Sequence, residues 1–368
     1  MHIIRSLDFG GVESRMILLA QHAEESDFEH TFCAIHSGGA AFAKMKNSGA
    51  NVTVLGEPAS IPSIRALSSL TRHIRKYSPD IVHTHGAEAN FHGLIASRFA
   101  KVPVTLGEEI GIPRHSPAAR IAFRIVYGTA DGVVAISNSV KNAIVTLQEA
   151  NREDIHVVLN PARMLDTVTR RSSLKNANQS FRLGFAGRLE EVKNASSLLD
   201  AIAIVRDSGV QATLDIVGNG SQRALLEKQA LALGLSKSVA FHGFMEDPFS
   251  TLGSCDLYIQ PSLSEGFGIA LVEAMSAGLA TLATPVGGAT EIIEHGINGL
   301  LLEDVDGQSI ANGVIAAAAL GRDELARIGQ TARASVLSRF SPTNYIHSLD
   351  RLYDSTLTER RNRTGTAA

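Results

Sequence analysis

The stretch DLYIQPSLSEGFGIALVEAMSAGLATLATP, residues Asp256 to Pro285, decides the fold class of this chain. A short apolar run stands at each of its ends, and a longer apolar segment that begins near Ile269 fits a helix between them. Two strands that are joined through a helix form a parallel pair, with the helix covering one face of the sheet. The stretch therefore predicts a strand, a buried helix and a second parallel strand.

The same alternation of strand-like runs with amphipathic segments continues along most of the chain, which predicts an α/β fold. It pauses once, at the polar stretch from Asn160 to Ser180, which starts with Asn-Pro and carries no clear period. We therefore expect two doubly wound, Rossmann-like domains that face each other across a cleft. The expected order is an N-terminal domain (1–160), a linker (161–180), a C-terminal domain (181–340), a helix that can cross back to the N-terminal domain (341–357) and a disordered tail (358–368).

Composition limits the partners and the cellular compartment that we expect for the protein. The 368 residues carry a net charge of −3, which gives no attraction to nucleic acid, so no nucleic-acid partner is expected. Cys33 and Cys255 lie far apart in the sequence and suggest a reduced, cytoplasmic protein. The longest apolar run, from Val314 to Leu320, is too short to span a bilayer, so any membrane contact must be peripheral.

Two glutamates stand out within the opening stretch. Glu265 precedes a Gly-Phe-Gly turn, and Glu273 lies in a helix that is otherwise nearly all apolar. Each carboxylate needs either a structural partner or a ligand, and the sequence leaves both alternatives open. A hydrolytic pair is excluded, because eight helical residues span ~12 Å, beyond the ~5 to 9.5 Å that glycoside hydrolysis requires.

Glycines and cations gather where predicted strands end. The first strand runs into Gly10 and Gly11, and Gly266 and Gly268 precede the buried helix, so backbone N–H groups can face an anion there. Arg188 and Lys193 follow the first strand of the C-terminal domain and suit phosphate, unless Glu190 and Glu191 pair with them in a solvated loop. Further strand ends are rich in glycine and strengthen the prediction of a phosphate pocket. They contain Gly218, Gly220, Gly287 and Gly288.

The segment DIVHTHG ends the fourth predicted strand with His83 and His85 on one face of the sheet. His85, which is followed by a glycine at the strand edge, is the better candidate for contact with a ligand in the cleft. The alternative is a histidine that is hydrogen-bonded inside the core. We expect no metal, because no cysteine or carboxylate stands at a helpful spacing from this pair.

With these residues in view, the sequence resembles glycosyltransferase family 4, a group of retaining nucleotide-sugar transferases with the GT-B fold. The resemblance covers nearly the whole chain, and the two glutamates of the opening stretch match the signature of the family. The motifs occur in the order of the family. They are LDFGGVE, DIVHTHG, ADGVVAISNSVK, GRLEEVKN, IVGNGSQR, VAFHGF, the stretch from Pro261 to Thr284, and VGGATEII.

The resemblance implies a role for each candidate residue toward a nucleoside-diphosphate sugar, which is the co-substrate, and implies no further cofactor or metal. Glu265 would contact hydroxyls of the transferred sugar, Glu273 would hold the ribose, and His85 would lie near the reacting sugar. The remaining candidates would contact the diphosphate or the sugar, through side chains or backbone N–H groups. They are Gly11, Arg188, Lys193, Gly266, Phe267 and Gly268.

The implied activity is the transfer of a hexose or N-acetylhexosamine from a UDP- or GDP-sugar to a saccharide or lipid-linked saccharide acceptor, in surface polysaccharide, lipopolysaccharide or glycolipid synthesis. A nucleotide-sugar 2-epimerase of the same fold and a non-catalytic sugar-nucleotide-binding protein are the alternatives. The roles of Glu108 and Glu109 stay open between ion pairs with Arg114 or Arg120 and contacts with the acceptor. Contact with the inner face of the membrane also stays open. It would involve the basic side chains Arg65, Arg72, Arg75, Lys76, Arg114, Arg120 and Arg124.

Overall fold

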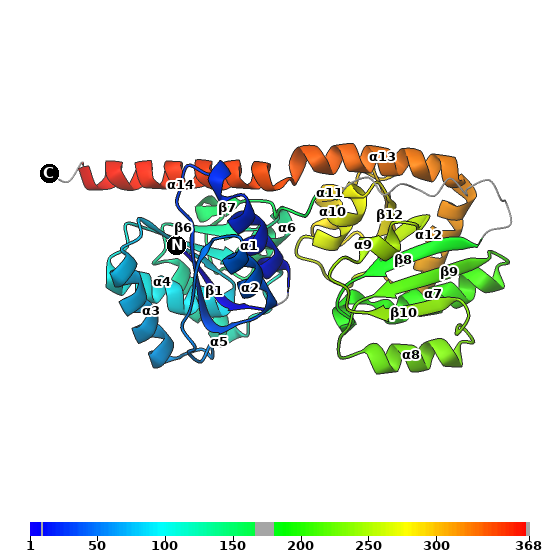
Figure 1. Ribbon diagram of the computed structural model, residues 1–368, viewed down its shortest axis with the longest axis horizontal. Coiled ribbons are helices and arrows are strands. Elements are labelled where there is room, and N and C mark those ends of the chain that lie inside the picture. The colour runs from blue at the N-terminus through cyan, green and yellow to red at the C-terminus, as the bar shows by residue number, and fades with distance from the viewer. Residues whose placement is uncertain (9, 166–179, 366–368) are drawn as a thin grey trace. The chain divides into compact units, whose positions relative to one another are not determined.

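The structure is a computed structural model that describes residues 1–8, 10–165 and 180–365 (Figure 1). The chain forms two compact units. The first comprises Met1–Pro161 together with the chain from Pro342 onward, and the second comprises the described residues of Ala162–Ser341. Each unit is a parallel sheet with covering helices, so the predicted fold class of two doubly wound α/β units is confirmed. Most of the expected linker, residues 166–179, lies outside the described residues.

The first unit is built on a seven-stranded parallel sheet in the order β3-β2-β1-β4-β5-β6-β7. The strand order reverses between β1 and β4, which is the kind of position where doubly wound sheets bind ligands. The strands are β1 (His2–Leu7), β2 (Thr31–Gly38), β3 (Asn51–Val54), β4 (Ile81–His85), β5 (Val104–Glu109), β6 (Gly132–Ala135) and β7 (Ile155–Val157).

Helices cover both faces of this sheet, and each face has its own apolar core. Ile4, Met16 and Leu349 belong to the core that includes α1 and α14, whereas Ile3 and Leu70 belong to the opposite core with α3. The helices are α1 (Gly11–Gln21), α2 (Ala40–Asn47), α3 (Ile64–Tyr77), α4 (Ala87–Ala100), α5 (Pro117–Tyr127), α6 (Asn138–Thr146) and α14 (Pro342–Gly365), with single 3-10 turns at η1 (Ala23–Glu25) and η2 (Arg152–Asp154).

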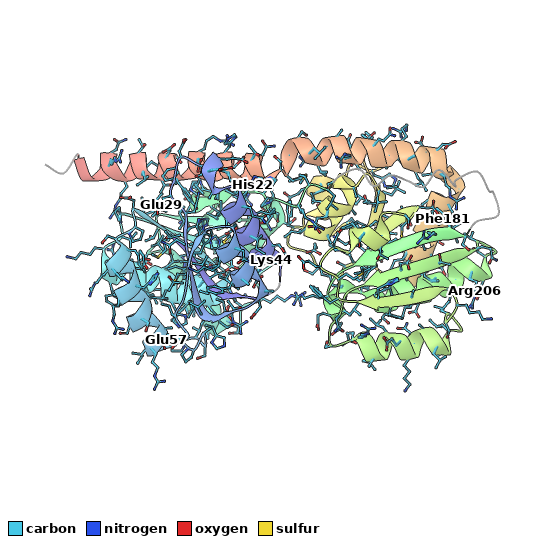
Figure 2. All side chains as sticks on the ribbon, in the orientation of Figure 1. His22, Glu29, Lys44, Glu57, Phe181 and Arg206 are labelled. Carbon is cyan, nitrogen blue, oxygen red and sulfur yellow. The ribbon has the colours of Figure 1, made fainter. Side chains whose placement is uncertain are left out.

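The second unit contains a six-stranded parallel sheet in the order β10-β9-β8-β11-β12-β13. Figure 2 shows the side chains of both units, with Phe181 marking the start of β8. The order reverses between β8 and β11, so the stretch from Asp256 to Pro285 stands beside this switch point. The strands are β8 (Phe181–Ala186), β9 (Ala212–Val217), β10 (Val239–Gly243), β11 (Leu257–Gln260), β12 (Ala280–Ala283) and β13 (Leu300–Leu301).

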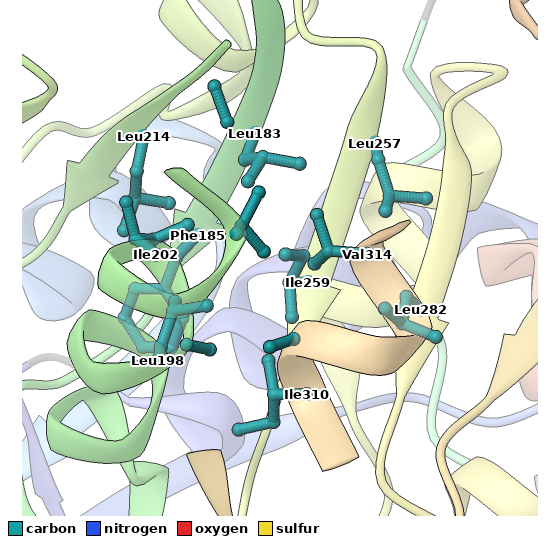
Figure 3. Packing of buried hydrophobic residues seen from close by; sticks show 14 of the residues in the cluster. Leu183, Phe185, Leu198, Ile202, Leu214, Leu257, Ile259, Leu282, Ile310 and Val314 are labelled. Atoms are coloured by element: carbon teal, nitrogen blue, oxygen red, sulfur yellow. The ribbon is translucent and has the colours of Figure 1, made fainter. Parts of the chain in front are cut away.

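The core of the second unit lies between its sheet and helices α7 and α12 (Figure 3). Leu183 and Ile259 from the sheet meet Leu198 from α7 and Val314 from α12, and each of these side chains is fully buried. The helices are α7 (Ala195–Asp207), α8 (Arg223–Ala232), α9 (Phe249–Leu252), α10 (Ile269–Ser276), α11 (Ala289–Ile292), α12 (Gly307–Leu320) and α13 (Arg322–Arg339), with one 3-10 turn at η3 (Glu191–Lys193).

The expected disordered tail from residue 358 is wrong for the part that the structure describes, because α14 continues to Gly365. Leu349, Leu352 and Tyr353 bury one side of this helix in the first unit. Arg360 adds an ion pair to Asp131 at 3.7 Å, which supports the helix beyond its apolar part. Within the described residues, none of the helices combines the length and the apolar character that crossing a lipid bilayer requires.

Candidate active site

The carboxyl ends of β8 and β11 lie side by side, because these strands are neighbours in the sheet of the second unit. The chain leaves β8 through η3 and leaves β11 through residues 261–268. Asn194 ties the two segments together, since its Nδ2 donates to the carbonyls of Pro261 (3.1 Å) and Val305 (2.7 Å). The two segments therefore form one surface at the edge where parallel sheets bind their ligands.

Lys193 and Glu265 meet on this surface. Nζ of Lys193 lies 2.5 Å from Oε2 of Glu265, and the hydroxyl of Ser262 donates to the same oxygen over 3.5 Å. The Lys193 and Glu265 side chains are 21% and 13% exposed, so both keep some access to solvent. Glu265 thus has a structural partner, and the pair still presents a cation and an anion next to each other. An ammonium can bind phosphate while a carboxylate accepts hydrogen bonds from sugar hydroxyls.

Arg188 is exposed in the turn that follows β8. The alternative in which Glu190 and Glu191 neutralise both cations of this loop is wrong for Lys193, whose partner is Glu265. The Glu190 carboxylate instead accepts hydrogen bonds from the backbone N–H and the hydroxyl of Ser221, at 3.0 and 2.6 Å. These bonds lower the pKa of Glu190. The structure therefore leaves Lys193 beside Glu265, on the side of the loop that faces the β11 segment.

Four of the glycines at strand ends allow neighbouring loops to pack closely. This packing accounts for glycine at these positions without any contact to a phosphate. A Cβ atom on Gly218 would lie 1.8 Å from the carbonyl oxygen of Gly187, and one on Gly287 would lie 1.5 Å from that of Glu265. Gly220 and Gly288 are equally close to other backbone atoms, at 2.4 and 2.2 Å from a carbonyl oxygen. The glycines after β9 and β12 are therefore needed by the neighbouring loops, a purpose that the sequence did not reveal.

Gly287→Ala is expected to displace the Glu265 loop, because the new methyl group would overlap the Glu265 carbonyl. Gly278→Ala is a matched control, since both glycines have positive φ (55° and 81°) but nothing lies within 4 Å of a Cβ at Gly278. Overpacking should make Gly287→Ala about 1–3 kcal/mol less stable than the control in urea unfolding. Equal losses for the two variants would contradict the packing that we describe.

Helix α10 begins next to the Lys193–Glu265 pair. Its N-cap is Gly268 at φ 106°, and no described side chain caps its first N–H groups. These N–H groups and the positive end of the helix dipole therefore stand at the same edge as Gly266 and Glu265. The ring of Phe267 is buried against the ring of Phe340 at 5.4 Å, so only the backbone of Phe267 could contact a ligand.

Glu273 lies one turn into α10 with a partly buried side chain. Its carboxylate receives no hydrogen bond from the described residues. Burial raises the pKa of Glu273 to about 7, while the charge of Arg163 acts in the opposite direction. A carboxylate in such a position is costly unless donors approach it. Glu273 is therefore suited to accept hydrogen bonds from hydroxyl groups of a ligand.

Gly11 and His85 belong to the first unit. Gly11 is exposed at the start of α1, but the carboxylate of Glu13 turns back over the preceding residue, 2.4 Å from where a Cβ on Gly10 would be. An acidic side chain in the first turn stabilises the helix and competes with an incoming anion. The phosphate contact of Gly11 stays a prediction.

His85 is buried at the end of β4, so its ring is not exposed at the strand edge. Its Nε2 is hydrogen-bonded to Nδ1 of His2 at 2.9 Å, and its Nδ1 contacts the carboxylate of Glu108. Burial lowers the pKa of His85 in spite of this carboxylate. The structure supports the alternative of a hydrogen-bonded core histidine. The predicted contact of His85 with a sugar would require these bonds to open.

The Glu108 carboxylate pairs with Arg15, so the alternative of an ion pair with Arg114 or Arg120 is wrong for Glu108. Both terminal nitrogens of Arg15 contact the Glu108 carboxylate, one of them at 2.8 Å, and Nη1 also donates to Oδ1 of Asn160 at 2.8 Å. Burial alone would raise the pKa of Glu108, but the charges of Arg15 and His85 lower it to about 2. Arg15 and His2 do not stand out in the sequence as site residues. The only signal was the adjacency of β1, β4 and β5 in a doubly wound sheet.

The chain is similar to known protein families and to named glycosyltransferases. Residues 9–163 match the family described as Glycosyltransferase Family 4, and residues 167–335 match the one described as Glycosyl transferases group 1. The chain is 23% identical over 344 residues to the capsular polysaccharide biosynthesis glycosyltransferase CapM of Staphylococcus aureus, covering 88% of this chain and 90% of CapM. It is 26% identical over 309 residues to the N-acetyl-alpha-D-glucosaminyl L-malate synthase of Bacillus anthracis, covering 80% of each.

Solved structures share the fold. Anabaena HepE in complex with UDP matches with a TM-score of 0.81 at 24% identity, covering 96% of this chain and 99% of HepE. The lipopolysaccharide outer core galactosyltransferase WaaB matches with a TM-score of 0.74 at 18% identity, covering 96% of this chain and 99% of WaaB. At these identities the likeness shows the fold alone.

Proposed function

The chain belongs to glycosyltransferase family 4, whose model matches residues 9–163, while that of the glycosyl transferases group 1 matches residues 167–335, and we propose that it is a retaining hexosyltransferase. The donor is a UDP- or GDP-sugar, and the acceptor is a saccharide or lipid-linked saccharide. Its relatives carry names from capsular polysaccharide and diphosphoundecaprenol-linked glycan synthesis. We therefore assign the protein to surface polysaccharide or glycolipid assembly on the cytoplasmic side of the membrane.

The observation that carries this proposal is the Lys193–Glu265 pair beside the start of α10. Arg188 and Lys193 bind the diphosphate, and the N–H groups of residues 266–268 approach the β-phosphate and the sugar. Glu265 accepts hydrogen bonds from hydroxyls of the transferred sugar, and Glu273 accepts hydrogen bonds from the ribose. The two cations and the backbone N–H groups stabilise negative charge on the departing diphosphate by charge-assisted hydrogen bonds.

In the proposed reaction, the bond between the anomeric carbon and the diphosphate oxygen breaks, and a bond from that carbon to the acceptor oxygen forms on the same face. The proton of the acceptor hydroxyl passes to the departing nucleoside diphosphate. Lys193, Arg188 and the α10 N-terminus neutralise the leaving group, so the proposed mechanism needs no metal at the diphosphate. The contacts of Glu265 with the sugar contribute most in the transition state, when positive charge develops on the sugar.

Incubation with UDP- and GDP-sugars, with and without acceptor glycans, tests the function. A transferase releases nucleoside diphosphate faster when an acceptor is present and yields a glycosylated product. A 2-epimerase converts the sugar nucleotide without an acceptor, and a binding protein releases nothing. No acceptor-dependent release from any donor that binds would contradict the proposal.

We also propose that the first unit contacts the anionic inner face of the membrane, where a lipid-linked acceptor would lie. Ile121 and Ile125 are each 65% exposed on one side of α5, and Arg120 and Arg124 are exposed beside them. Exposed isoleucines next to arginines on a helix are typical of a surface that inserts at the headgroup level. The first residue of α3, Ile64, is also exposed, and three arginines follow it on that helix.

The change of Ile121 and Ile125 to Asp is expected to remove the protein from liposomes that contain anionic lipid. Leu231→Asp on α8 is the matched control, because Leu231 is 69% exposed but belongs to the second unit. In flotation at low salt, the wild type and the control should rise with the liposomes, while the double variant stays at the bottom. A wild-type protein that does not float would end the membrane proposal and leave the transfer reaction unaffected.

A further inference from the structure

Three side chains that the proposed reaction does not use converge at the carboxyl edge of the first sheet. Glu109 is the last residue of β5, His115 precedes α5, and Glu149 follows α6. One ligand-type atom from each of these residues lies within 4.8 Å of the other two. The topology brings them together, because β5 and β6 are neighbours and the segments that follow them share one edge.

Contacts around the cluster hold its side chains in place. Nδ1 of His115 lies 2.7 Å from Oε1 of Glu149, and the His115 ring stacks on Phe123 with a centroid distance of 4.3 Å and an interplanar angle of 5°. The Tyr127 hydroxyl donates to Oε1 of Glu109. These side chains have little freedom, so the positions of the three ligand-type groups are largely fixed before anything binds.

Within the residues that the structure describes, the cluster contains two buried carboxyl groups that lack a cationic partner in direct contact. Glu109 is 4% exposed and Glu149 is 1% exposed, and no Lys or Arg among the described residues forms an ion pair with either carboxylate. Oε2 of Glu149 is buried without a hydrogen-bond partner in the described part of the chain. A buried carboxylate oxygen without a donor is destabilising, and a cation would satisfy it.

We propose that Glu109, His115 and Glu149 bind a divalent transition-metal ion of the Zn²⁺ type. One imidazole and two carboxylates are a ligand set that Zn²⁺ accepts, whereas Mg²⁺ and Ca²⁺ favour oxygen ligands alone. Tetrahedral ligands at ~2.0–2.2 Å from zinc lie roughly 3.4 Å apart. Nδ1 of His115 and Oε1 of Glu149, now 2.7 Å apart, would therefore exchange their hydrogen bond for bonds to the ion and separate slightly. His115, whose side chain is 14% exposed, provides the route of entry.

The bound ion would fasten the segment between β5 and α5 to the end of α6. This segment lies at the edge of the first sheet where ligands of doubly wound folds bind. The metal site is a second site, far from Lys193 and Glu265 in the sequence, and the proposed transfer reaction does not require it. It also revises the expectation from sequence that the chain carries no metal site, because that expectation considered spacing along the chain and not the neighbouring strands.

A second group of possible ligands, His2, His83 and His85, is a weaker candidate. Both ring nitrogens of His2 are hydrogen-bonded to other histidines, at 2.9 Å each. Arg15 lies 3.2 Å from Nδ1 of His85, and its permanent positive charge disfavours a second cation. In the Glu109 cluster the neighbouring cation is Arg120, which is exposed and donates to the backbone carbonyl of His115 at 3.2 Å and not to a ligand-type atom.

The test is a titration of the full-length protein, first stripped with chelator, with Zn²⁺, and separately with Mg²⁺ and Ca²⁺. We expect one Zn²⁺ per chain, a rise in melting temperature at saturation, and visible absorption bands of tetrahedral Co²⁺ on substitution. Glu149→Gln, Glu109→Gln and His115→Ala should each weaken Zn²⁺ binding by about 100-fold or more and abolish the melting shift. Mg²⁺ and Ca²⁺ should not reproduce the shift.

Glu153→Gln and His36→Ala are the matched controls, because both residues are exposed in the first unit outside the cluster. They should bind Zn²⁺ as the wild type does. The glutamine variants keep the size of the side chain, and circular dichroism verifies their folding. A wild-type protein without stoichiometric Zn²⁺ binding overturns the proposal, as does wild-type affinity in folded Glu149→Gln and His115→Ala variants. Neither result depends on whether the protein transfers a sugar.

Discussion

Lys193→Ala is expected to reduce the transfer rate by about 100-fold or more, comparable to the loss of one preorganised donor to a developing oxyanion. Nζ of Lys193 lies at the carboxyl edge of β8, next to the start of α10, where the diphosphate is proposed to bind. The same change leaves Glu265 without its cation, so the carboxylate loses its fixed position. Steady-state kinetics with the cognate donor, together with calorimetric titration of the nucleoside diphosphate, would show both effects.

Two further variants define what the lysine contributes. Lys193→Arg keeps a cation near Glu265 and should recover part of the activity, although its planar group cannot reproduce a point charge. Lys228→Ala removes an exposed lysine from α8 of the same unit and should behave as the wild type. If Lys193→Ala retains both nucleotide affinity and turnover, Lys193 does not contact the diphosphate.

Arg15→Met should produce the largest loss of stability, about 3–5 kcal/mol, because it leaves the Glu108 charge buried without its main partner. The Arg15 and Glu108 side chains are each 1% exposed, and Arg15 also reaches Asn160 and His85. Arg327→Met is the control, since it breaks an ion pair with Glu324 whose side chains are 53% and 40% exposed. Exposed pairs contribute about 0–1 kcal/mol. Calorimetric unfolding measures both variants.

The loss caused by Arg15→Met should depend on pH. The pKa of Glu108 falls from 4.5 to about 2 on folding, so its ion pair stabilises the protein above pH 4.5 and loses this effect as pH falls toward 2. In the variant the carboxyl protonates more easily, and the difference from the wild type should shrink under acid. A difference no larger than that of Arg327→Met at pH 7 would show that Arg15 and Glu108 do not form a structural pair.

The fold could be predicted from sequence because each unit repeats one simple pattern. Short runs such as Leu257–Gln260 and Ala280–Ala283 flank the apolar helix from Ile269, and such a pattern has one common solution, a right-handed parallel unit. The C-terminal end of α14 could not be predicted from such a pattern. Its last turns are polar, and one of their contacts is an ion pair between Arg360 and Asp131, which are far apart in the sequence.

The candidate site could be predicted only in part. Lys193 and Glu265 follow strands that adjoin in any doubly wound sheet with this strand order, so their proximity could be inferred, but their direct pairing depends on loop geometry. The burial of His85 could not be inferred. The side chains on that face of β4 are covered from α14, where Tyr353 lies 2.8 Å from Nδ1 of His83 across 270 residues of sequence. Alternation along a strand identifies a face and does not reveal what covers it.

The central claim, that the second unit binds a sugar nucleotide with distinct roles for its two glutamates, is tested most directly by one calorimetric titration. UDP and GDP are titrated into the wild type, Glu265→Gln and Glu273→Gln. We expect the wild type to bind one of the two nucleotides, Glu273→Gln to lose about 10-fold or more in affinity, and Glu265→Gln to bind nearly as the wild type does. Wild-type protein that binds neither nucleotide, or an unchanged affinity in Glu273→Gln with a loss in Glu265→Gln, would contradict the account.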